Sequence, residues 1–285
     1  MASLIEAQGL TKRFGTHAAL DGASFKVETG RIVGLIGPNG AGKTTALKAI
    51  LGLTRCEGRL SVLGLDPYRD RNALTERVSF IADVAVLPRW LRVSQAVEFV
   101  AGVHPRFRAD RCHAFLERTA IRRDSRVKEL SKGMITQLHL ALVMAIDAQL
   151  LVLDEPTLGL DILSRKQFYD SLLSDYMDAD KTILVTTHQV EEIENILTDV
   201  IFIDRGRIAL DLPMDEIPAR YAQLLAPPDR AEAARALKPL SERQLLGRHV
   251  FLYEDPDPKA LAPLGELRQP SIADLFVAKL KGGAA

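Results

Sequence analysis

The chain has 285 residues, and its 37 basic and 37 acidic side chains give a formal net charge of zero at pH 7. This balance provides no overall field that would attract nucleic acid or an anionic membrane. A hydrophobic content of 47% is sufficient for one large α/β domain with a smaller appendage. Cys56 and Cys112 lack the spacing of metal ligands and suit a reducing compartment. We expect a soluble protein, because neither a secretory signal nor an apolar run near the roughly 18 residues that cross a bilayer is evident.

Short strand-like runs open the chain. They cover residues 4–10, 23–27 and 31–36, and glycines and charged residues separate them. Further strands are predicted at 59–63 and 78–81. Apolar residues at helical spacing predict a helix over 43–51, directly after the third strand.

A glycine-rich sequence connects that third strand to the helix. It reads Gly37-Pro38-Asn39-Gly40-Ala41-Gly42-Lys43-Thr44-Thr45 and matches the phosphate-loop pattern G-x-x-x-x-G-K-[ST]. Such a turn directs backbone N–H groups and a helix N-terminus at one anion. Lys43 is then predicted to reach the β- and γ-phosphates, and the Thr44 hydroxyl to bind Mg²⁺. A chance turn is the alternative, but the flanking strand and helix favour a nucleoside triphosphate site.

Helical spacing replaces the strand pattern from residue 94 to 123. Pro105 separates two helices within this stretch. Ser131 is placed to cap a longer helix that continues to Ala145. We therefore predict a helical insert over about residues 84–145.

Alternating strands and helices follow the insert. The apolar run 150–153 is typical of a central parallel strand. After it we predict, in chain order, a helix at 163–177, a strand at 182–186, a helix at 190–197 and a strand at 199–203. This alternation predicts a mainly parallel sheet covered by helices.

Two carboxylates, Asp154 and Glu155, follow the 150–153 strand directly. In phosphate-loop ATPases an aspartate at this position serves the Mg²⁺ site, directly or through water. Glu155 is placed to act as the general base for the water that attacks the γ-phosphorus. Alone, the pair is also compatible with an ordinary strand end. Together with the phosphate loop it predicts ATP hydrolysis.

The composition changes at about residue 212, after which prolines interrupt the chain repeatedly. Within this region a strand is predicted at 249–253 and an amphipathic helix at 272–280. We therefore divide the chain into an ATPase domain over 1–211 and an accessory subdomain over 212–285.

Three further motifs discriminate among phosphate-loop families: Leu130-Ser131-Lys132-Gly133-Met134, Thr157-Leu158-Gly159-Leu160-Asp161 and Thr186-Thr187-His188. In order and spacing, the chain over about 3–210 resembles the nucleotide-binding subunits of ABC transporters. Two other runs are similar to the ATPases of bacterial export systems: Leu20-Asp21-Gly22-Ala23-Ser24-Phe25 and Pro270-Ser271-Ile272-Ala273-Asp274-Leu275-Phe276. The resemblance implies an α/β P-loop NTPase fold of ABC type. Its parts are a mainly parallel sheet, an N-terminal antiparallel β subdomain, the helical insert and a small C-terminal α+β extension.

The resemblance also implies a two-site dimer, in which ATP lies between the phosphate loop of one subunit and the signature helix of the other. Ser131 and Gly133 would contact that ATP, since a hydroxyl, a glycine N–H and a helix N-terminus form an anion site. Ser131 alone also fits an ordinary helix cap. Lys132 is either a cation beside the triphosphate or a solvated charge.

Three other residues receive roles from the resemblance. His188 would hydrogen-bond the γ-phosphate and hold the attacking water, although a histidine after a strand can also be structural. Phe14 occupies the adenine-stacking position, with a core phenylalanine as the alternative. Asp161 belongs to the family's nucleotide site.

Asp83 departs from the family pattern. The strand at 78–82 aligns it with a family glutamine that contacts Mg²⁺ and senses the membrane partner. A carboxylate can supply an oxygen ligand for Mg²⁺, but when ionised it donates no hydrogen bond. We expect Asp83 to alter metal coordination or partner coupling without abolishing hydrolysis. The signature departs less, with Lys132 and Met134 in place of glycine and glutamine.

The predicted function is an ATPase subunit that binds ATP and Mg²⁺ and energises a membrane ABC exporter. Its expected partners are a second ATPase subunit, most simply a second copy, and integral membrane permease subunits that dock at 84–90. It would be cytoplasmic and peripheral on the inner face of the cell membrane, with no span of its own and no nucleic acid partner.

A non-transport ABC ATPase acting on ribosomes or nucleic acid is the alternative function. Such proteins often carry two nucleotide-binding halves or a long coiled-coil insertion, and the sequence shows neither. A nucleotide-binding module without turnover is disfavoured by Glu155 and His188.

Overall fold

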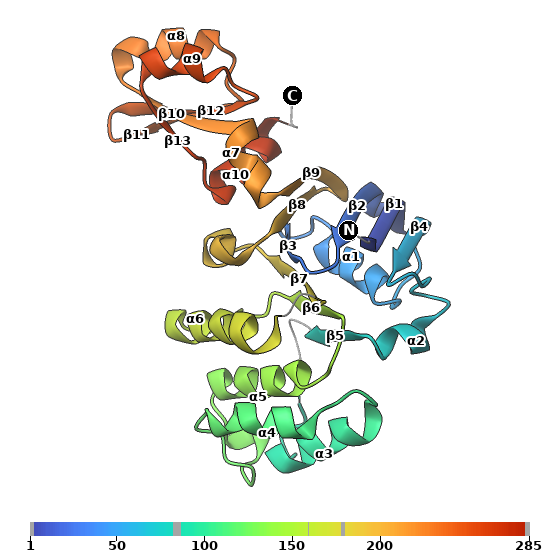
Figure 1. Cartoon of the computed structure of the whole chain (residues 1–285). Coiled ribbons are helices and arrows are strands. Elements are labelled where there is room, and N and C mark those ends of the chain that lie inside the picture. The colour runs from blue at the N-terminus through green and yellow to red at the C-terminus, as the bar shows by residue number, and fades with distance from the viewer. Residues whose placement is uncertain (1–2, 82–86, 159, 178–179, 283–285) are drawn as a thin grey trace.

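The computed structural model describes residues 3–81, 87–158, 160–177 and 180–282. Figure 1 shows a central α/β body with a helical group at one end and a small sheet with helices at the other. The described strands form sheets of three, six and four strands. Within the same described ranges, no helix is both long and apolar enough to cross a bilayer.

The central sheet is six-stranded, in the order β5-β6-β7-β3-β8-β9. Its strands run parallel except β9, which pairs antiparallel with β8. Alternate residues of the strands face two separate hydrophobic clusters, so β3, β6 and β7 are buried throughout. This confirms the predicted parallel sheet. Its strands are β3 (Ile32–Ile36), β5 (Val78–Ile81), β6 (Leu150–Asp154), β7 (Thr182–Thr187), β8 (Asp199–Asp204) and β9 (Arg207–Pro213).

A three-stranded antiparallel sheet covers one side of the central sheet. Its order is β2-β1-β4, with β1 at Ser3–Phe14, β2 at His17–Glu28 and β4 at Glu57–Val62. Its buried residues share a hydrophobic cluster with α1 (Lys43–Ile50). The short helix α2 (Arg71–Thr75) connects β4 to β5. The N-terminal antiparallel subdomain is therefore confirmed.

The insert is helical, as predicted, and has its own hydrophobic core. In this core Val93, Cys112 and Leu138 are fully buried, and burial raises the pKa of the Cys112 thiol to about 12. Its elements are α3 (Val93–Val103), α4 (Ala109–Glu117), the 3₁₀ turn η1 (Val127–Glu129) and α5 (Lys132–Met144). Figure 1 shows α3, α4 and α5 grouped below β5.

Two predicted helices differ from the structure. The one predicted at 163–177 is the α-helix α6 (Ile162–Ser171), which continues as a π-turn, η2 (Leu172–Tyr176). Tyr176 is buried there, and its hydroxyl donates to Ala148 O at 3.2 Å. The helix predicted at 190–197 is two 3₁₀ turns, η3 (Val190–Glu192) and η4 (Glu194–Ile196). Both turns end before β8, which begins at Asp199.

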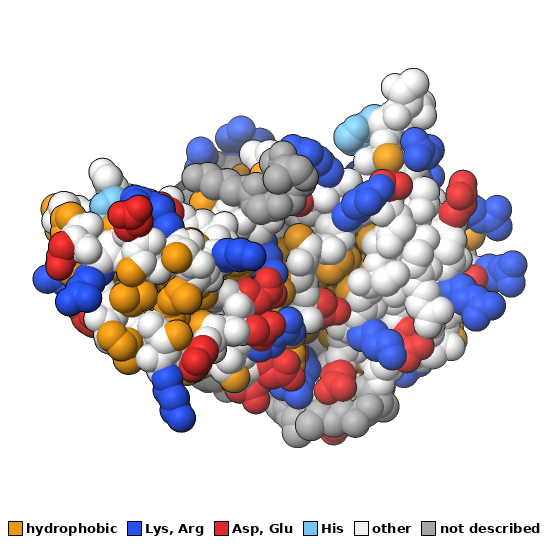
Figure 2. Space-filling model, turned by 90° about the horizontal axis from the view of Figure 1, so that it is seen from above, with side chains coloured by type: hydrophobic (Ala, Val, Ile, Leu, Met, Phe, Trp, Pro, Cys, Tyr) orange, Lys and Arg blue, Asp and Glu red, His pale blue; other side chains and the backbone are white. Residues whose placement is uncertain are grey.

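The C-terminal extension is an α+β unit, as predicted. Its four-stranded antiparallel sheet has the order β11-β12-β10-β13. One face packs against α8 and α9 in a separate cluster, while Tyr221 and Leu252 join the main core beside α10. Acidic and basic side chains are interspersed over the face seen in Figure 2. The elements are η5 (Met214–Glu216), α7 (Ile217–Arg220), β10 (Tyr221–Ala226), η6 (Pro228–Arg230), α8 (Ala231–Ala236), β11 (Ser241–Leu245), β12 (Arg248–Glu254), α9 (Pro258–Leu261), η7 (Ala262–Leu264), β13 (Glu266–Arg268) and α10 (Ile272–Gly282).

Candidate active site

The phosphate loop connects β3 to α1 and takes a shape that only glycine allows at two positions. Gly42, the N-cap of α1, has φ 111°, and a Cβ there would lie 2.3 Å from Ala19 O. A Cβ at Gly37 would lie 2.4 Å from Ile203 O. The close packing holds the loop against β2 and β8. The first N–H groups of α1 are therefore held ready for an anion.

A cavity of about 340 Å³ opens over this loop. Ten predicted site residues line it: Phe14, Pro38, Asn39, Gly40, Gly42, Lys43, Thr44, Thr45, Asp154 and Glu155. His17 and Ala19, which the sequence analysis did not single out, complete the described lining. Gly37 and Ala41 are buried beneath it. The structure thus gathers the phosphate loop, the two carboxylates after β6 and the aromatic residue of β1 around one space.

Lys43 supplies a positive charge at the floor of the cavity. Its side chain is 7% exposed, and its Nζ donates to Gly37 O at 2.6 Å and to Pro38 O at 3.4 Å. The same ammonium lies 3.6 Å from Glu155 Oε1. A buried ammonium with rotatable donors is suited to bind a phosphate oxygen in this position.

Thr186, at the end of β7, holds both carboxylate residues in place. Asp154 and Thr186 are paired across the parallel strands β6 and β7, and the Thr186 hydroxyl donates to Asp154 Oδ1 at 2.6 Å. The N–H of Glu155 donates to Thr186 O at 3.1 Å and lies 3.2 Å from Thr186 Oγ1. Glu155 itself has φ 48°, in the left-handed region. This kink turns the chain out of β6 directly after Asp154.

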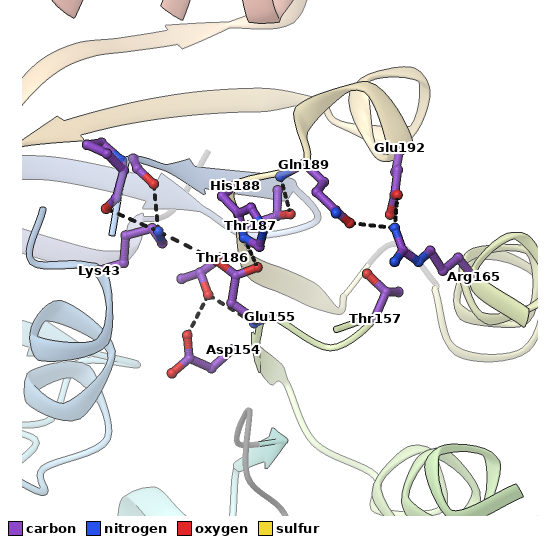
Figure 3. A network of polar contacts seen from close by, with 12 residues as sticks. Lys43, Asp154, Glu155, Thr157, Arg165, Thr186, Thr187, His188, Gln189 and Glu192 are labelled. Atoms are coloured by element: carbon purple, nitrogen blue, oxygen red, sulfur yellow. Dashed lines mark hydrogen bonds and ion pairs between the residues drawn. The ribbon is translucent and has the colours of Figure 1, made fainter. Parts of the chain in front are cut away.

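Glu155 and His188 form a close pair. His188 Nδ1 lies 2.8 Å from Glu155 Oε2, and the two side chains are 40% and 14% exposed. Glu155 therefore lies between the imidazole and the Lys43 ammonium, as Figure 3 shows. A carboxylate oriented in this way can accept a proton from a water molecule held in the cavity. The structure brings the predicted catalytic residues together.

A second polar cluster, which sequence reasoning missed, lies beside this pair. Arg165 donates to Gln189 Oε1 at 2.6 Å and to Leu160 O at 2.8 Å, and it forms an ion pair with Glu192. Deeper in the fold, Tyr169 lies 3.4 Å from Thr157 Oγ1, and burial raises the pKa of its phenol to about 12. The only sequence signal for the cluster is the nearness of Arg165 and Gln189 to the Asp161 and His188 motifs.

The signature residues are not part of the cavity. Ser131 is the N-cap of α5, and its Oγ accepts a hydrogen bond from Met134 N at 3.2 Å. Ser131 and Lys132 are exposed, and Gly133 lines a different cavity, of about 260 Å³, between α4, α5 and α6. Asp161 is exposed at the start of α6. Asp83 lies outside the described residues.

Comparisons with known proteins agree with this geometry. The family model described as "ABC transporter" matches residues 20–158. A Nod factor export ATP-binding protein I from Burkholderia thailandensis is 36% identical over an alignment 301 positions long, and the alignment covers 96% of this chain and 95% of the relative. The daunorubicin resistance ATP-binding protein DrrA3 from Streptomyces coeruleorubidus is 34% identical over an alignment 266 positions long, and the alignment covers 86% of this chain and 83% of the relative.

A solved structure described as an ATP-binding subunit of an ABC transporter has the same fold. It is 25% identical, superposes with a TM-score of 0.68, and covers 75% of this chain and 91% of its own. The chain therefore belongs to the ABC transporter family, as an ATP-binding ATPase subunit.

Proposed function

We propose that this chain hydrolyses ATP to energise a membrane exporter. The observation that carries the proposal is the convergence of Lys43, Asp154 and Glu155 on the phosphate-loop cavity. The export direction is supported by the relatives, whose names refer to Nod factor export and to daunorubicin resistance. The membrane subunits select the cargo.

ATP is the substrate of this cavity. The loop from Gly37 to Thr45 binds the phosphates through its N–H groups, and Lys43 contributes the charge. Phe14 stacks on the adenine, which is supported by its 56% exposure and its place in the cavity wall.

The cavity also has donors that fit Mg²⁺. The Thr44 hydroxyl and the Asp154 carboxylate line it together, and oxygen ligands are those that Mg²⁺ favours. Thr186 orients the carboxylate through Oδ1. We assign Thr44 and Asp154 to the metal, with Asp83 as a further ligand. Bound there, Mg²⁺ neutralises charge on the phosphates.

Glu155 acts as the general base. It takes the proton of the water whose oxygen attacks the γ-phosphorus, and the bond from that phosphorus to the ADP oxygen breaks. His188 hydrogen-bonds the γ-phosphate and orients this water. Their 2.8 Å contact supports joint action.

Two copies form the complete site. Ser131, Lys132 and Gly133 are at the N-terminus of α5, away from the cavity of their own chain. In a homodimer they contact the ATP of the other copy, with Asp161 beside the interface. ATP between the subunits holds the dimer, and hydrolysis releases it.

Integral membrane permease subunits bind the helical insert. Trp90 and Phe99 are 70% and 66% exposed there, which supports such a contact, although 84–86 of the expected docking segment lies outside the described residues. The protein is then peripheral on the cytoplasmic face of the cell membrane. We divide it into the ATPase domain, 1–211, and the accessory subdomain, 212–285.

Purification of the tagged chain from detergent-solubilised membranes tests this function. A polytopic membrane protein should copurify in fixed ratio, and Trp90→Ser together with Phe99→Ser should release it without changing ATP binding. Exposed Tyr68→Ser, outside the insert, is the matched control. Cosedimentation with ribosomes and absence of a membrane partner would support the non-transport alternative and refute the proposal.

A further inference from the structure

Arg165 connects two segments that leave the active site. It lies in the first turn of α6, and its guanidinium contacts both segments. Figure 3 shows its contacts with Gln189 and Glu192. On one side Nε donates to Leu160 O at 2.8 Å. On the other side the same guanidinium donates to Gln189 Oε1 at 2.6 Å and pairs with Glu192 Oε1. Arg165 does not line the phosphate-loop cavity.

Each segment begins at a member of the proposed catalytic pair. Gln189 follows His188 directly. On the other side, Leu158 N donates to Glu155 O at 3.1 Å, so the turn that leads to Leu160 is bonded to Glu155 itself. Arg165 therefore connects the segment after Glu155 to the segment after His188. Glu155 and His188 also contact each other directly, at 2.8 Å.

Buried Val190 and Ile193 hold the turn after His188 against the main core, whereas the side chains of Gln189 and Glu192 are bonded to Arg165. The bond from Glu192 N to Gln189 O within η3 is long, at 3.4 Å. Glu192 Oε2 is buried, and no described residue donates a hydrogen bond to it. The side chains of Arg165 and Glu192 are 20% and 27% exposed, so their attraction is less screened than that of a surface pair.

We propose that Arg165 is a positioning residue for hydrolysis: it fixes the turn that bears His188 and thereby sets the contact of His188 with Glu155. The inference rests on the proposed ATPase reaction. The planar guanidinium is suited to this role because one rigid group satisfies a carbonyl, an amide and a carboxylate at once.

Steady-state kinetics of Arg165→Met test the proposal. We expect kcat to fall roughly 10- to 100-fold, because small misplacements of catalytic groups have effects of this size, while the KM for ATP changes less than about twofold. In a His188→Ala background, Arg165→Met should change single-turnover phosphate release by less than about twofold, since it acts through His188. A purely structural role would give additive losses and would overturn the proposal.

Arg77→Met is the matched control. Arg77 is also half-buried, and it likewise binds a glutamine amide oxygen, Gln149 Oε1 at 2.7 Å, and a backbone carbonyl, Leu63 O at 3.3 Å. It precedes β5, at the opposite ends of the parallel strands from the active site. We expect unchanged kcat for this variant. Equal losses for Arg77→Met and Arg165→Met would contradict a specific role.

A second measurement does not depend on turnover. The imidazole ¹⁵N resonances of His188, assigned with His188→Asn, should shift in Arg165→Met and stay in place in Arg77→Met. If Arg165→Met does not fold, the double variant Arg165→Met/Glu192→Leu replaces it, because it leaves no unpaired carboxylate at this position. The double variant should give the same shift of the His188 resonances. Unchanged resonances refute the positioning role. Shifted resonances in a chain without ATPase activity would instead refute the proposed function, and would show only that Arg165 sets the position of His188.

Discussion

Removal of one hydroxyl, in Thr186→Val, should disturb the active site without changing its packing. Thr186 is fully buried in β7. Its hydroxyl donates to Asp154 Oδ1 at 2.6 Å and lies 3.2 Å from the N–H of Glu155. Valine has nearly the same shape, so the substitution removes these polar contacts while it leaves the β-strand and its neighbours in place.

The structure gives the size of the effect. A hydrogen bond to a charged group contributes about 1.5–3 kcal/mol, and its loss leaves the Asp154 carboxylate, itself 5% exposed, short of a donor. Glu155 N keeps its bond to Thr186 O at 3.1 Å. Thr182→Val is the matched control in the same strand, because Thr182 is also fully buried but its hydroxyl accepts a hydrogen bond from a neutral group, Gly30 N, at 3.0 Å. Its loss should cost about 1 kcal/mol.

Thermal unfolding followed by circular dichroism compares the two variants. At about 2–4 °C per kcal/mol, we expect Tm to fall by about 3–12 °C in Thr186→Val and by about 2–4 °C in Thr182→Val. ATP turnover should fall roughly tenfold or more only in Thr186→Val, because Asp154 loses its fixed orientation. Equal changes in Tm and activity for both variants would refute the reasoning.

Two further predictions use other parts of the fold. Gly42→Ala should abolish ATP binding in isothermal titration calorimetry, because a Cβ would meet Ala19 O at 2.3 Å. Gly40→Ala is strained by its φ of 81° but has no atom within 4 Å of its Cβ, so it should weaken binding less and keep a measurable affinity. In the C-terminal extension, the hydrogen bond from Arg235 lowers the pKa of Glu242 from 4.5 to about 2. The stability advantage of the wild type over Glu242→Gln in urea unfolding should therefore be complete above pH 5 and disappear as the pH falls from about 4.5 toward 2; an advantage that persists at pH 2 would contradict the assignment.

Local patterns made much of the fold predictable. The strands of the central sheet were recognisable because burial on both faces requires continuous apolar runs, and the phosphate loop because its glycines are required by backbone geometry. The two 3₁₀ turns after His188 were not predictable. Val190 and Ile193 have the spacing of one helix face in an α-helix and in a 3₁₀ helix alike.

The candidate site could also be predicted only in part. Asp154 and Glu155 could be predicted because they follow a strand directly. The contact of Thr186 with Asp154 could not, because it depends on the register between β6 and β7. The Arg165 cluster depends on how α6 packs against the turn after β7, which no local pattern encodes. Ser131 caps α5, one of its two expected roles; its contact with ATP stays a prediction, since it requires a second subunit.

Phosphate release by purified Glu155→Gln, compared with the wild type, tests the central claim most directly. The amide keeps the shape of the side chain but loses its basicity, so hydrolysis should fall at least 100-fold, in line with the usual contribution of a general base. ATP binding should persist, and the variant should elute as a dimer with ATP in size-exclusion chromatography. Glu57→Gln, an exposed carboxylate on β4, is the control and should behave as the wild type. Normal hydrolysis by Glu155→Gln would contradict the assigned base and the mechanism built on it.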